Sequence, residues 1–410
     1  MNLARTDGVR CLSSAAIAAA CLALTNPAAS GQTLEGLGTL PFPNSSPRVA
    51  AISGDGSTVV GIDAHPQRDE PTAVRWVRGT GWELLMPELE YSGANAVSHN
   101  GSVVVGFASV EGFGFRWTVA TGAQPLGTLT SNAAAVSSDG TVIVGGLFVN
   151  PEKQKEHACR WTLENGFTDL GVIPGGWVAR GTGVSGDGAV IAGWSYIGPQ
   201  IFAFRWTQET GMESLGTLPE GSYSSAAAIS RDGEVIVGRA DVGGPTHMFR
   251  WTASNGMEDL GRLAGWQYAL ANATNADGSV IVGEAYQPGG GDSRAILWKR
   301  GLGVVNLNTY LVDAGVDLTG WILSDAIGVS DDGRTIVGMG AHIGRYEAWI
   351  ATLPSCPADF NENFLVNSQD FFDFLTAYFG ADPGADFNED GEVNSADFFD
   401  FISEFMGGCD

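Results

Sequence analysis

Oxygen-bearing side chains recur at alternate positions near the end of this chain, in a pattern that occurs twice. The second copy supplies side-chain oxygens at positions 1, 3, 5, 9 and 12 of a loop of about 12 residues, with glycine at position 6. Completed by a main-chain carbonyl at position 7, this is the ligand set that a hard cation such as Ca²⁺ requires. The predicted calcium ligands of the second loop are Asp386, Asn388, Asp390, the carbonyl of Glu392, Asn394 and Asp397. Those of the first loop are Asp359, Asn361, Asn363, Asn367 and Asp370.

The two loops are not equal in charge. The second has three ligating carboxylates and Gly391 at the sharp turn, whereas the first has only Asp359 and Asp370 as ligating carboxylates. Asn363 stands at position 5 of the first loop, and Phe364 stands where glycine is expected. Fewer negative charges weaken the attraction for the ion, so we expect one tight and one weak site.

The elements that hold these loops are predicted to be helices, one after each loop. Eleven of the 20 phenylalanines lie between Cys356 and Asp410, mostly on these helices, which argues against a disordered tail. The segment holds no Lys or Arg, so it differs sharply in charge from the rest of the chain. Cys356 and Cys409 bracket it and are predicted to form a disulfide, which could add about 4 kcal/mol by restricting the unfolded chain.

Most of the remaining chain consists of seven copies of one phrase. Each copy begins with an Ala-Ile/Val-Ser-x-Asp-Gly strand and turn and continues through an apolar strand, a Phe-Arg-Trp-Thr strand and a Leu-Gly-x-Leu strand. The turn glycines are Gly56, Gly101, Gly140, Gly188, Gly233, Gly278 and Gly333. The strand tryptophans are Trp76, Trp117, Trp161, Trp206, Trp251, Trp298 and Trp349. A period of about 45 residues with four strands per repeat predicts a seven-bladed β-propeller.

The chain ends of this ring are predicted to meet. The seventh copy stops at Leu353 without its Leu-Gly-x-Leu strand, and residues 34–40 carry that strand instead. We therefore expect the N-terminal strand to complete the last blade and to remove an exposed sheet edge. The predicted domains are a signal peptide at 1–31, the propeller at 32–354 and the calcium unit at 355–410.

Residues 1–31 have the layout of a secretory signal. Arg5 and Arg10 precede an apolar run at 11–24, and small residues follow Pro27. The run is shorter than the roughly 18 residues that span a membrane, and a lipoprotein site at Cys21 is an alternative. Export would place the protein in a compartment where disulfides can form. The net charge of −25 argues against nucleic-acid binding.

The repeat resembles the HAF-type extracellular repeat, named for His-Ala-Phe ahead of Arg-Trp. The match lies at residues 157–161, 203–206 and 247–251, and the resemblance covers roughly 33–354. It implies a secreted or surface protein and no particular activity. The sixth and seventh copies depart from the pattern, with Leu297 and Ala348 in place of the arginine.

The tail resembles dockerin domains, because Asp stands at position 12 and no helix enters either loop. The Cys356 and Gly408-Cys409 ends resemble the GC-type variant found at the C-termini of exported proteins. The resemblance implies calcium-dependent docking to a cohesin-like or surface-anchoring receptor. It places the partner contacts at loop positions 10 and 11, which are Ser368, Gln369, Ser395 and Ala396.

No catalytic residue is assigned, because no metal-type His/Cys cluster, nucleophile elbow or phosphate loop occurs. Arg75, Arg116, Arg160, Arg205 and Arg250 are interpreted as fixed polar contacts rather than as a ring of cations lining a channel. The tryptophans are interpreted as packing anchors, and Cys159 as a small buried side chain. Longer loops at 63–72, 148–156 and 306–324 are interpreted as surface loops in preference to ligand sites, the last with a short helix.

Two functions remain. The first is a non-catalytic, monomeric binding protein, secreted or held at the cell surface, whose propeller loops bind a polysaccharide or protein. The alternative is a carbohydrate-active enzyme, a polysaccharide hydrolase or lyase, delivered by the dockerin-like tail. Carboxylates that converge in a pocket at one mouth of the ring would favour the enzyme.

Overall fold

The structure, a computed structural model, describes residues 33–67, 70–89, 91–108, 113–127, 130–150, 155–289, 291–353, 357–361, 366, 368–388 and 390–407. Several predicted features lie outside these residues: the signal segment 1–31, the Cys356–Cys409 disulfide, and the calcium ligands Asn363 and Asn367. Among the described residues, no helix is long and apolar enough to cross a membrane.

Antiparallel sheets of four strands make up most of the described chain. One sheet contains β2 (Arg48–Ile52), β3 (Thr58–Ala64), β4 (Pro71–Val77) and β5 (Gly81–Leu84). The next contains β6 (Ser92–Val97), β7 (Val103–Ala108), β8 (Phe113–Thr118) and β9 (Gly122–Pro125). It is followed by β10 (Thr130–Val136), β11 (Val142–Asn150), β12 (Lys155–Thr162) and β13 (Gly166–Gly171). The sheet after that contains β14 (Val178–Val184), β15 (Val190–Ile197), β16 (Gln200–Thr207) and β17 (Gly211–Ser214).

Two further groups of four strands share one larger sheet. The first is β18 (Ser224–Ile229), β19 (Ile236–Asp241), β20 (Thr246–Thr252) and β21 (Gly256–Gly261). The second is β22 (Tyr268–Thr274), β23 (Val280–Tyr286), β24 (Ser293–Lys299) and β25 (Gly303–Asn306). A single parallel pair, Thr246 with Tyr268, joins the two groups.

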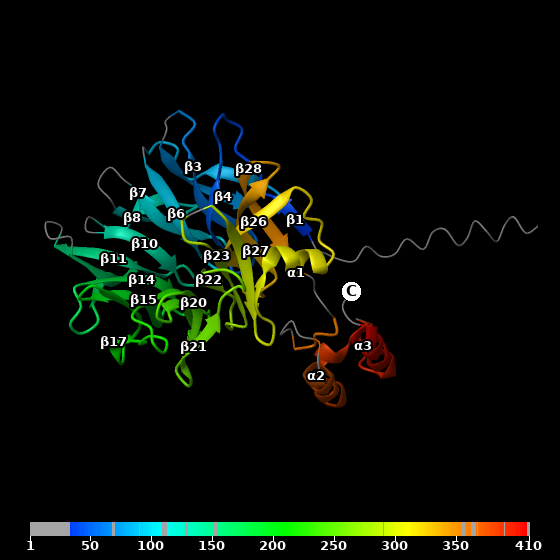
Figure 1. Cartoon of the computed structure of the whole chain (residues 1–410). Helices are drawn as coiled ribbons and strands as arrows, with labels where there is room; N and C mark the ends of the chain where they lie inside the picture. The colour runs from blue at the N-terminus through cyan, green and yellow to red at the C-terminus, as the bar shows by residue number, and fades with distance from the viewer. Residues whose placement is uncertain are drawn as a thin grey trace, which may run out of the picture.

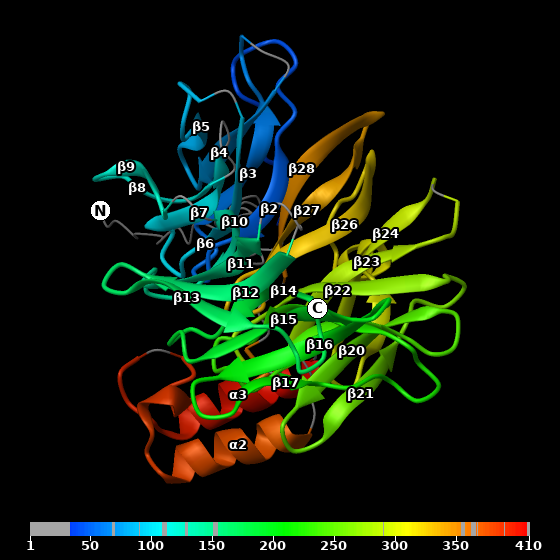
Figure 2. The same cartoon turned by 90° about the vertical axis from the view of Figure 1, so that its left-hand side faces the viewer.

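The remaining sheet joins the two ends of the strand region. It consists of β26 (Trp321–Val329), β27 (Thr335–His342), β28 (Arg345–Thr352) and β1 (Thr33–Gly36). Strand β1 pairs antiparallel with β28, so that Leu34 lies opposite Ala351 and Gly36 opposite Trp349. In Figure 2 the sheet that begins at β2 (blue) lies beside β27 and β28 (orange). Side chains of the two sheets form one core cluster that includes Val49 and Val337.

Each strand type follows from its sequence. The second strand of each group is apolar on both faces because it is covered by sheets on both sides, and Val280, Ile281 and Val282 are fully buried. The turn before it needs a left-handed residue: Gly278 has φ +73°, and a Cβ there would lie 2.6 Å from Val235 of the neighbouring group of strands. Glycine is therefore required by conformation and by space.

The core lies between neighbouring sheets rather than inside any one of them. The buried hydrophobic side chains form separate clusters. Most clusters combine side chains from the second and third strands of one group with side chains from the first, second and third strands of the next group. The repeat tryptophans contribute to these clusters, as predicted, and Trp349 is fully buried while Trp161 donates its Nε1–H to the carbonyl of Leu126 at 3.0 Å. A sheet of this kind buries its faces only against its neighbours.

Three α-helices complete the described chain. Helix α1 (Leu307–Asp313) confirms the short helix predicted in the 306–324 insertion, and Leu307 and Leu311 anchor it in the core. Helices α2 (Ser368–Phe379) and α3 (Ser395–Gly407) each follow a predicted calcium loop and lie apart from the sheets (Figure 1). Phe374 and Phe401 stack between them with ring centroids 4.0 Å apart. These fully buried rings form the centre of a separate small core.

Candidate functional site

The Ser-x-Asp-Gly turns meet at one end of a central channel. The Asp side chain of the turn stays local: in the first turn Asp55 accepts hydrogen bonds from Ser53 Oγ at 2.6 Å and from the Ser57 amide at 2.9 Å. Burial by itself raises the pKa of Asp55. The hydrogen bonds lower it by a larger amount, so the pKa lies below its usual value. The Asp and Gly of the motif therefore build the turn, and the residue x is left to face the axis.

The backbones of the turns are linked to one another around the channel. The hydrogen bonds run from Asp55 N to His99 O (2.9 Å), His99 N to Ser138 O (3.1 Å), Ser138 N to Gly186 O (3.1 Å), Gly186 N to Arg231 O (2.8 Å), Asp232 N to Ala276 O (3.3 Å), Ala276 N to Asp331 O (3.1 Å) and Asp331 N to Gly54 O (2.8 Å). Each group of four strands thus donates to the next, and the last bond returns to the first group. We call this set the axial belt.

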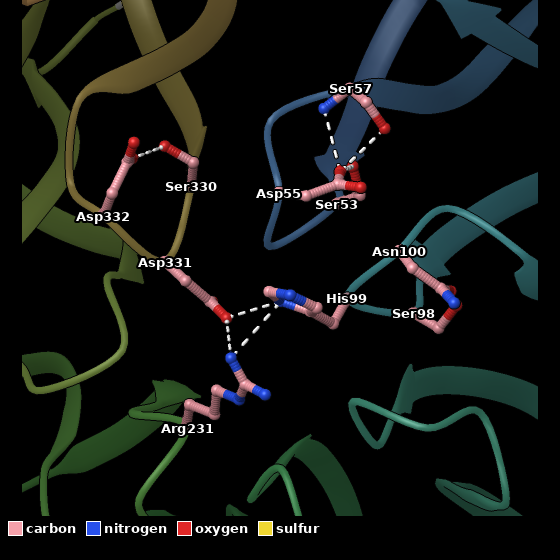
Figure 3. Close-up of polar contacts among 10 residues, drawn as sticks. All are labelled: Ser53, Asp55, Ser57, Ser98, His99, Asn100, Arg231, Ser330, Asp331 and Asp332. Atoms are coloured by element: carbon pink, nitrogen blue, oxygen red, sulfur yellow. Dashed lines mark hydrogen bonds and ion pairs between the residues drawn. The ribbon is translucent and has the colours of Figure 1, made fainter.

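Three of the residues at position x of these turns have ionisable side chains. His99 Nδ1 lies 2.7 Å from Asp331 Oδ2, and Arg231 Nη1 donates to the same oxygen at 2.9 Å. The three side chains come from turns of three different sheets and point toward one another over the mouth of the channel (Figure 3). Glycine at the neighbouring x position makes this possible, because a Cβ on Gly54 would lie 2.2 Å from His99 Nδ1.

The channel behind this cluster has a volume of about 340 Å³ and is lined by the first strand of each group. Its polar wall groups are already bonded to the next sheet. Asn95 Nδ2 donates to Asn132 Oδ1 at 2.5 Å, and Thr182 Oγ1 donates to the Ala226 carbonyl at 3.0 Å. The His99–Asp331–Arg231 cluster and the axial belt therefore hold the sheets together at this end, which we call the belt end.

Toward the opposite end of the strands, which we call the open end, lie two carboxylates whose pKa values are raised. Burial, and then the charge of Glu284, raise the pKa of Asp325 to about 7. Burial also raises the pKa of Glu284. Asn272 Nδ2 donates to Asp325 Oδ1 at 2.8 Å, and the two carboxylates raise the pKa of Tyr346 in addition to its burial. A buried acid near neutrality beside a second carboxylate is suited to proton transfer or to binding hydroxyl groups.

Sequence reasoning missed both ends. His99, Arg231 and Asp331 occupy the variable position of the repeated turn, which looked like a position without a fixed role. The signal was present, since the corresponding residues of the other turns are Gly, Ser or Ala. Asp325 and Glu284 could not be recognised from the sequence, because their pKa values are raised mainly by burial against neighbouring sheets.

The repeat arginines do not line the channel. Arg75 bonds Glu83 and lies 4.5 Å from the Trp117 ring centroid of the next sheet. Arg116 and Arg250 donate to turn carbonyls of the next group of strands, at Gly140 (3.3 Å) and Gly278 (3.4 Å). These three arginines make fixed polar contacts as predicted, Arg75 with a carboxylate and the other two with glycine carbonyls.

Cys159 is buried, as predicted. Burial and then the charge of Glu156 raise the pKa of its thiol to about 12, which keeps it protonated and unreactive.

The loops singled out from sequence are largely structural. His65 is buried, and its Nε2 lies 2.9 Å from the Pro87 carbonyl. Asp63 holds the Ser46 amide at 2.7 Å. In the 306–324 insertion Trp321 stacks on His342 with centroids 4.2 Å apart. Arg68, Asp69 and Lys153 lie outside the described residues.

The second predicted calcium loop has an ordered hydrogen-bond pattern. Asp386 accepts from the amides of Asp390 (3.0 Å) and Gly391 (2.8 Å), and the fully buried Asp397 accepts from the amides of Asn388 (3.1 Å) and Asn394 (2.7 Å). Gly391 has φ +91°, as position 6 requires. Each carboxylate oxygen keeps a further lone pair, so the donor set remains compatible with a hard cation.

The first loop shares one feature with the second. Asn361 N donates to Asp370 Oδ1 at 3.3 Å, which is the same bond from position 3 to position 12. Within the described residues, no three side chains of His, Cys, Asp or Glu are grouped to hold a metal ion. The predicted partner residues Ser368, Gln369, Ser395 and Ala396 form the first turns of α2 and α3.

Asp359 of the first loop lies against the sheets. It is buried, and its charge acts on Lys299 of β24, a fully buried side chain whose Nζ donates to Tyr310 Oη at 3.0 Å. Burial lowers the pKa of Lys299 to about 7, and Asp359 opposes that change. The tail is thus electrostatically coupled to β24 and α1.

Comparison with solved structures supports the fold. An oligogalacturonate lyase in complex with manganese is 13% identical, with a TM-score of 0.53 over 78% of this chain and 93% of that one. The oligogalacturonate lyase of Vibrio parahaemolyticus is 11% identical, with a TM-score of 0.52 over 78% and 94%. A prolyl endopeptidase is 12% identical, with a TM-score of 0.51 over 76% of this chain and 51% of that one. No family model and no curated protein matches this chain.

At these identities the likeness concerns the fold alone. The protein has a mainly-β fold of the β-propeller kind, built from four-stranded sheets. The HAF-type and dockerin resemblances, the domain limits and the calcium sites stay predictions.

Proposed function

We propose that this protein is a non-catalytic binding protein: a seven-bladed propeller closed by β1, with a calcium-binding, dockerin-like tail that docks it to a cell-surface or extracellular receptor. Support for closure comes from the β1–β28 pairing and from the Asp331–Gly54 bond of the axial belt, both of which cross from the last sheet to the first strands. Support for binding at the open end comes from the belt end itself, whose charged groups are occupied with one another.

The observation that carries the tail assignment is the hydrogen bond shared by the two loops. In both, the amide at position 3 donates to the carboxylate at position 12, so the same hydrogen bond occurs in both copies of the duplicated sequence. Ca²⁺ would be held by Asp386, Asn388, Asp390, the Glu392 carbonyl, Asn394 and Asp397, and would supply the charge that draws these oxygens together. Binding in this loop would order the start of α3, where the predicted partner residues lie.

The two loops are expected to differ in affinity. The second has one more ligating carboxylate than the first. In addition, the positive charge of Lys299 acts on Asp359 and opposes a cation near position 1 of the first loop. We therefore expect one tight site.

Titration calorimetry of the full chain with CaCl₂ tests the proposal. One tight site is expected, and Asp390→Ala should abolish it because that variant removes a ligating carboxylate. Glu404→Gln is the matched control: it removes one negative charge from α3 outside the loop and should leave the tight site in place. Tight calcium binding that survives Asp390→Ala, or no calcium binding at all, would refute the calcium assignment.

A carbohydrate-active enzyme is the second candidate, favoured by Asp325 and Glu284 at the open end. An acid with a pKa of about 7 beside a second carboxylate is the arrangement that general acid–base catalysis uses. Release of reducing ends or unsaturated products from a polysaccharide, lost in Glu284→Gln, would establish this candidate and overturn the non-catalytic one.

A further inference from the structure

Paired aromatic rings lie at the open end of the strands. Tyr268 begins β22 and Tyr286 ends β23, so the two residues lie opposite each other at the end far from the Asn275–Gly278 turn. Their ring centroids are 4.9 Å apart. Both rings are half-buried and leave part of their surface to solvent.

Other sheets repeat this pairing at the same place. Tyr91 contacts Phe107 at 5.4 Å and Trp177 contacts Tyr196 at 5.4 Å, in each case between the approach to a first strand and the end of a second strand. Trp177 is 47% exposed and Tyr91 is 40% exposed. Large aromatic rings left partly in water at one end of the fold are a recognised sign of a binding surface.

One hollow is lined by the Tyr268–Tyr286 pair, and a second lies near it. The first, of about 710 Å³, is lined by Tyr268, Glu284, Tyr286 and Ser293 among others. The second, of about 360 Å³, is lined by Tyr223 and Arg239 of the preceding strand group. The charges of Arg239 and Tyr223 act on Tyr286, so the hollows are neighbours across the boundary between the strand groups. Both volumes lie in the range of small-ligand sites.

The fold does not require these polar groups. The residues at the position of Glu284 in the other sheets are Ile62, Phe107, Gly146, Trp194, Arg239 and Met339. An apolar residue satisfies the packing there, and burial of a carboxylate is unfavourable, as the raised pKa of Glu284 indicates. A group that weakens the fold and faces a hollow is better explained by a ligand than by packing.

We propose that the arc from Tyr223 and Arg239 through Tyr286, Tyr268 and Glu284 binds a neutral polysaccharide. The aromatic faces match the C–H faces of pyranose rings, while Glu284 accepts hydrogen bonds from sugar hydroxyls and Arg239 donates to their oxygens. Neutral sugars are favoured over uronic acids because the chain carries a net charge of −25 and Glu284 lies within the arc. This inference rests on the proposed binding function and names its ligand class.

Affinity electrophoresis of the full chain in native gels tests the arc. The gels contain mixed-linkage β-glucan, xyloglucan or galactomannan as neutral probes, and polygalacturonate as the anionic probe. Retardation by at least one neutral probe is expected, and Tyr286→Ala should weaken it by about tenfold. Tyr286→Phe keeps the ring and should bind nearly as wild type, while Glu284→Gln should bind more weakly because a charged acceptor becomes neutral.

Phe379→Ala is the matched control, since it removes an exposed aromatic ring at the end of α2, outside the arc and outside the other aromatic pairs of the open end, and it should leave retardation unchanged. Equal melting temperatures show that each variant is folded. The proposal is overturned by retardation only in polygalacturonate, by no retardation in any neutral gel, or by Tyr286→Ala behaving like wild type. If the protein binds Ca²⁺ as expected but binds no neutral polysaccharide, only this inference is refuted. If it does not bind Ca²⁺, the calcium-dependent docking function is refuted, whatever the result with polysaccharides.

Discussion

Asp325→Asn is expected to stabilise the protein at alkaline pH. The carboxyl of Asp325 has a pKa raised from 3.8 to about 7, first by burial and then by the charge of Glu284. The folded chain therefore holds this proton more tightly than the unfolded chain. The free energy of unfolding falls as the pH rises from about 4 to about 7, and the full penalty is present above pH 7. Asparagine never ionises, so it avoids this penalty.

The magnitude follows from the shift. At 1.36 kcal/mol per pKa unit the full effect would be about 4 kcal/mol, and partial access of solvent to Asp325 reduces it to about 2–3 kcal/mol. The native hydrogen bond survives the change, because an Asn Oδ1 still accepts from Asn272 Nδ2. For a domain of this size a gain of 1 kcal/mol raises the melting temperature by about 1.5 °C, so we expect a rise of about 3–4 °C.

Differential scanning fluorimetry at pH 4 and pH 8 measures the effect. Asp325→Asn should melt above wild type at pH 8 and within about 1 °C of it at pH 4, where both side chains are uncharged. Asp331→Asn, at the belt end, is the control: it weakens the contacts with His99 and Arg231 and should not raise the melting temperature. An equal gain at both pH values, or no gain at pH 8, would refute the account of Asp325.

Two further predictions concern the ring. Deleting residues 32–41 removes β1 and the buried Leu37 and Leu40, which exposes the edge of β28, so aggregation or a large drop in melting temperature is expected; an unchanged melting curve would mean that β1 does not close the ring. Gly54→Ala should lower stability by about 1–3 kcal/mol, because its Cβ would lie 2.2 Å from His99 Nδ1 and 2.6 Å from Asp331 Oδ2. In a His99→Ala/Asp331→Ala background the same change should cost much less, and equal costs in the two backgrounds, measured by denaturant unfolding, would contradict the close contacts.

Local chemistry made the repeat predictable. Asp-Gly and Asn-Gly pairs set the turns, and the apolar Val-Ile-Val-Gly run predicted a strand buried on both faces, as Val280–Val282 confirm. The short helix in the 306–324 insertion also followed from the sequence.

The candidate site could not be predicted in the same way. His99, Arg231 and Asp331 belong to turns 100–232 positions apart in the sequence, and only the arrangement of the sheets about one axis brings them within hydrogen-bond distance. Sequence reasoning did not single them out, because residue types alone do not show that residue x of each turn faces the axis while the Asp beside it bonds within its own turn.

The same limit applies to the acidity of the open end. The sequence by itself determined the period, the turns, the apolar strands and the order of oxygen ligands in the tail, because each of these depends on residues within a few positions of one another. Only the tertiary structure determines that Asp325 is buried where the charge of Glu284 acts on it. The same holds for the interaction of the Asp359 charge with the buried Lys299. Desolvation and Coulomb interaction act through space, so they depend on which sheets become neighbours rather than on spacing along the chain.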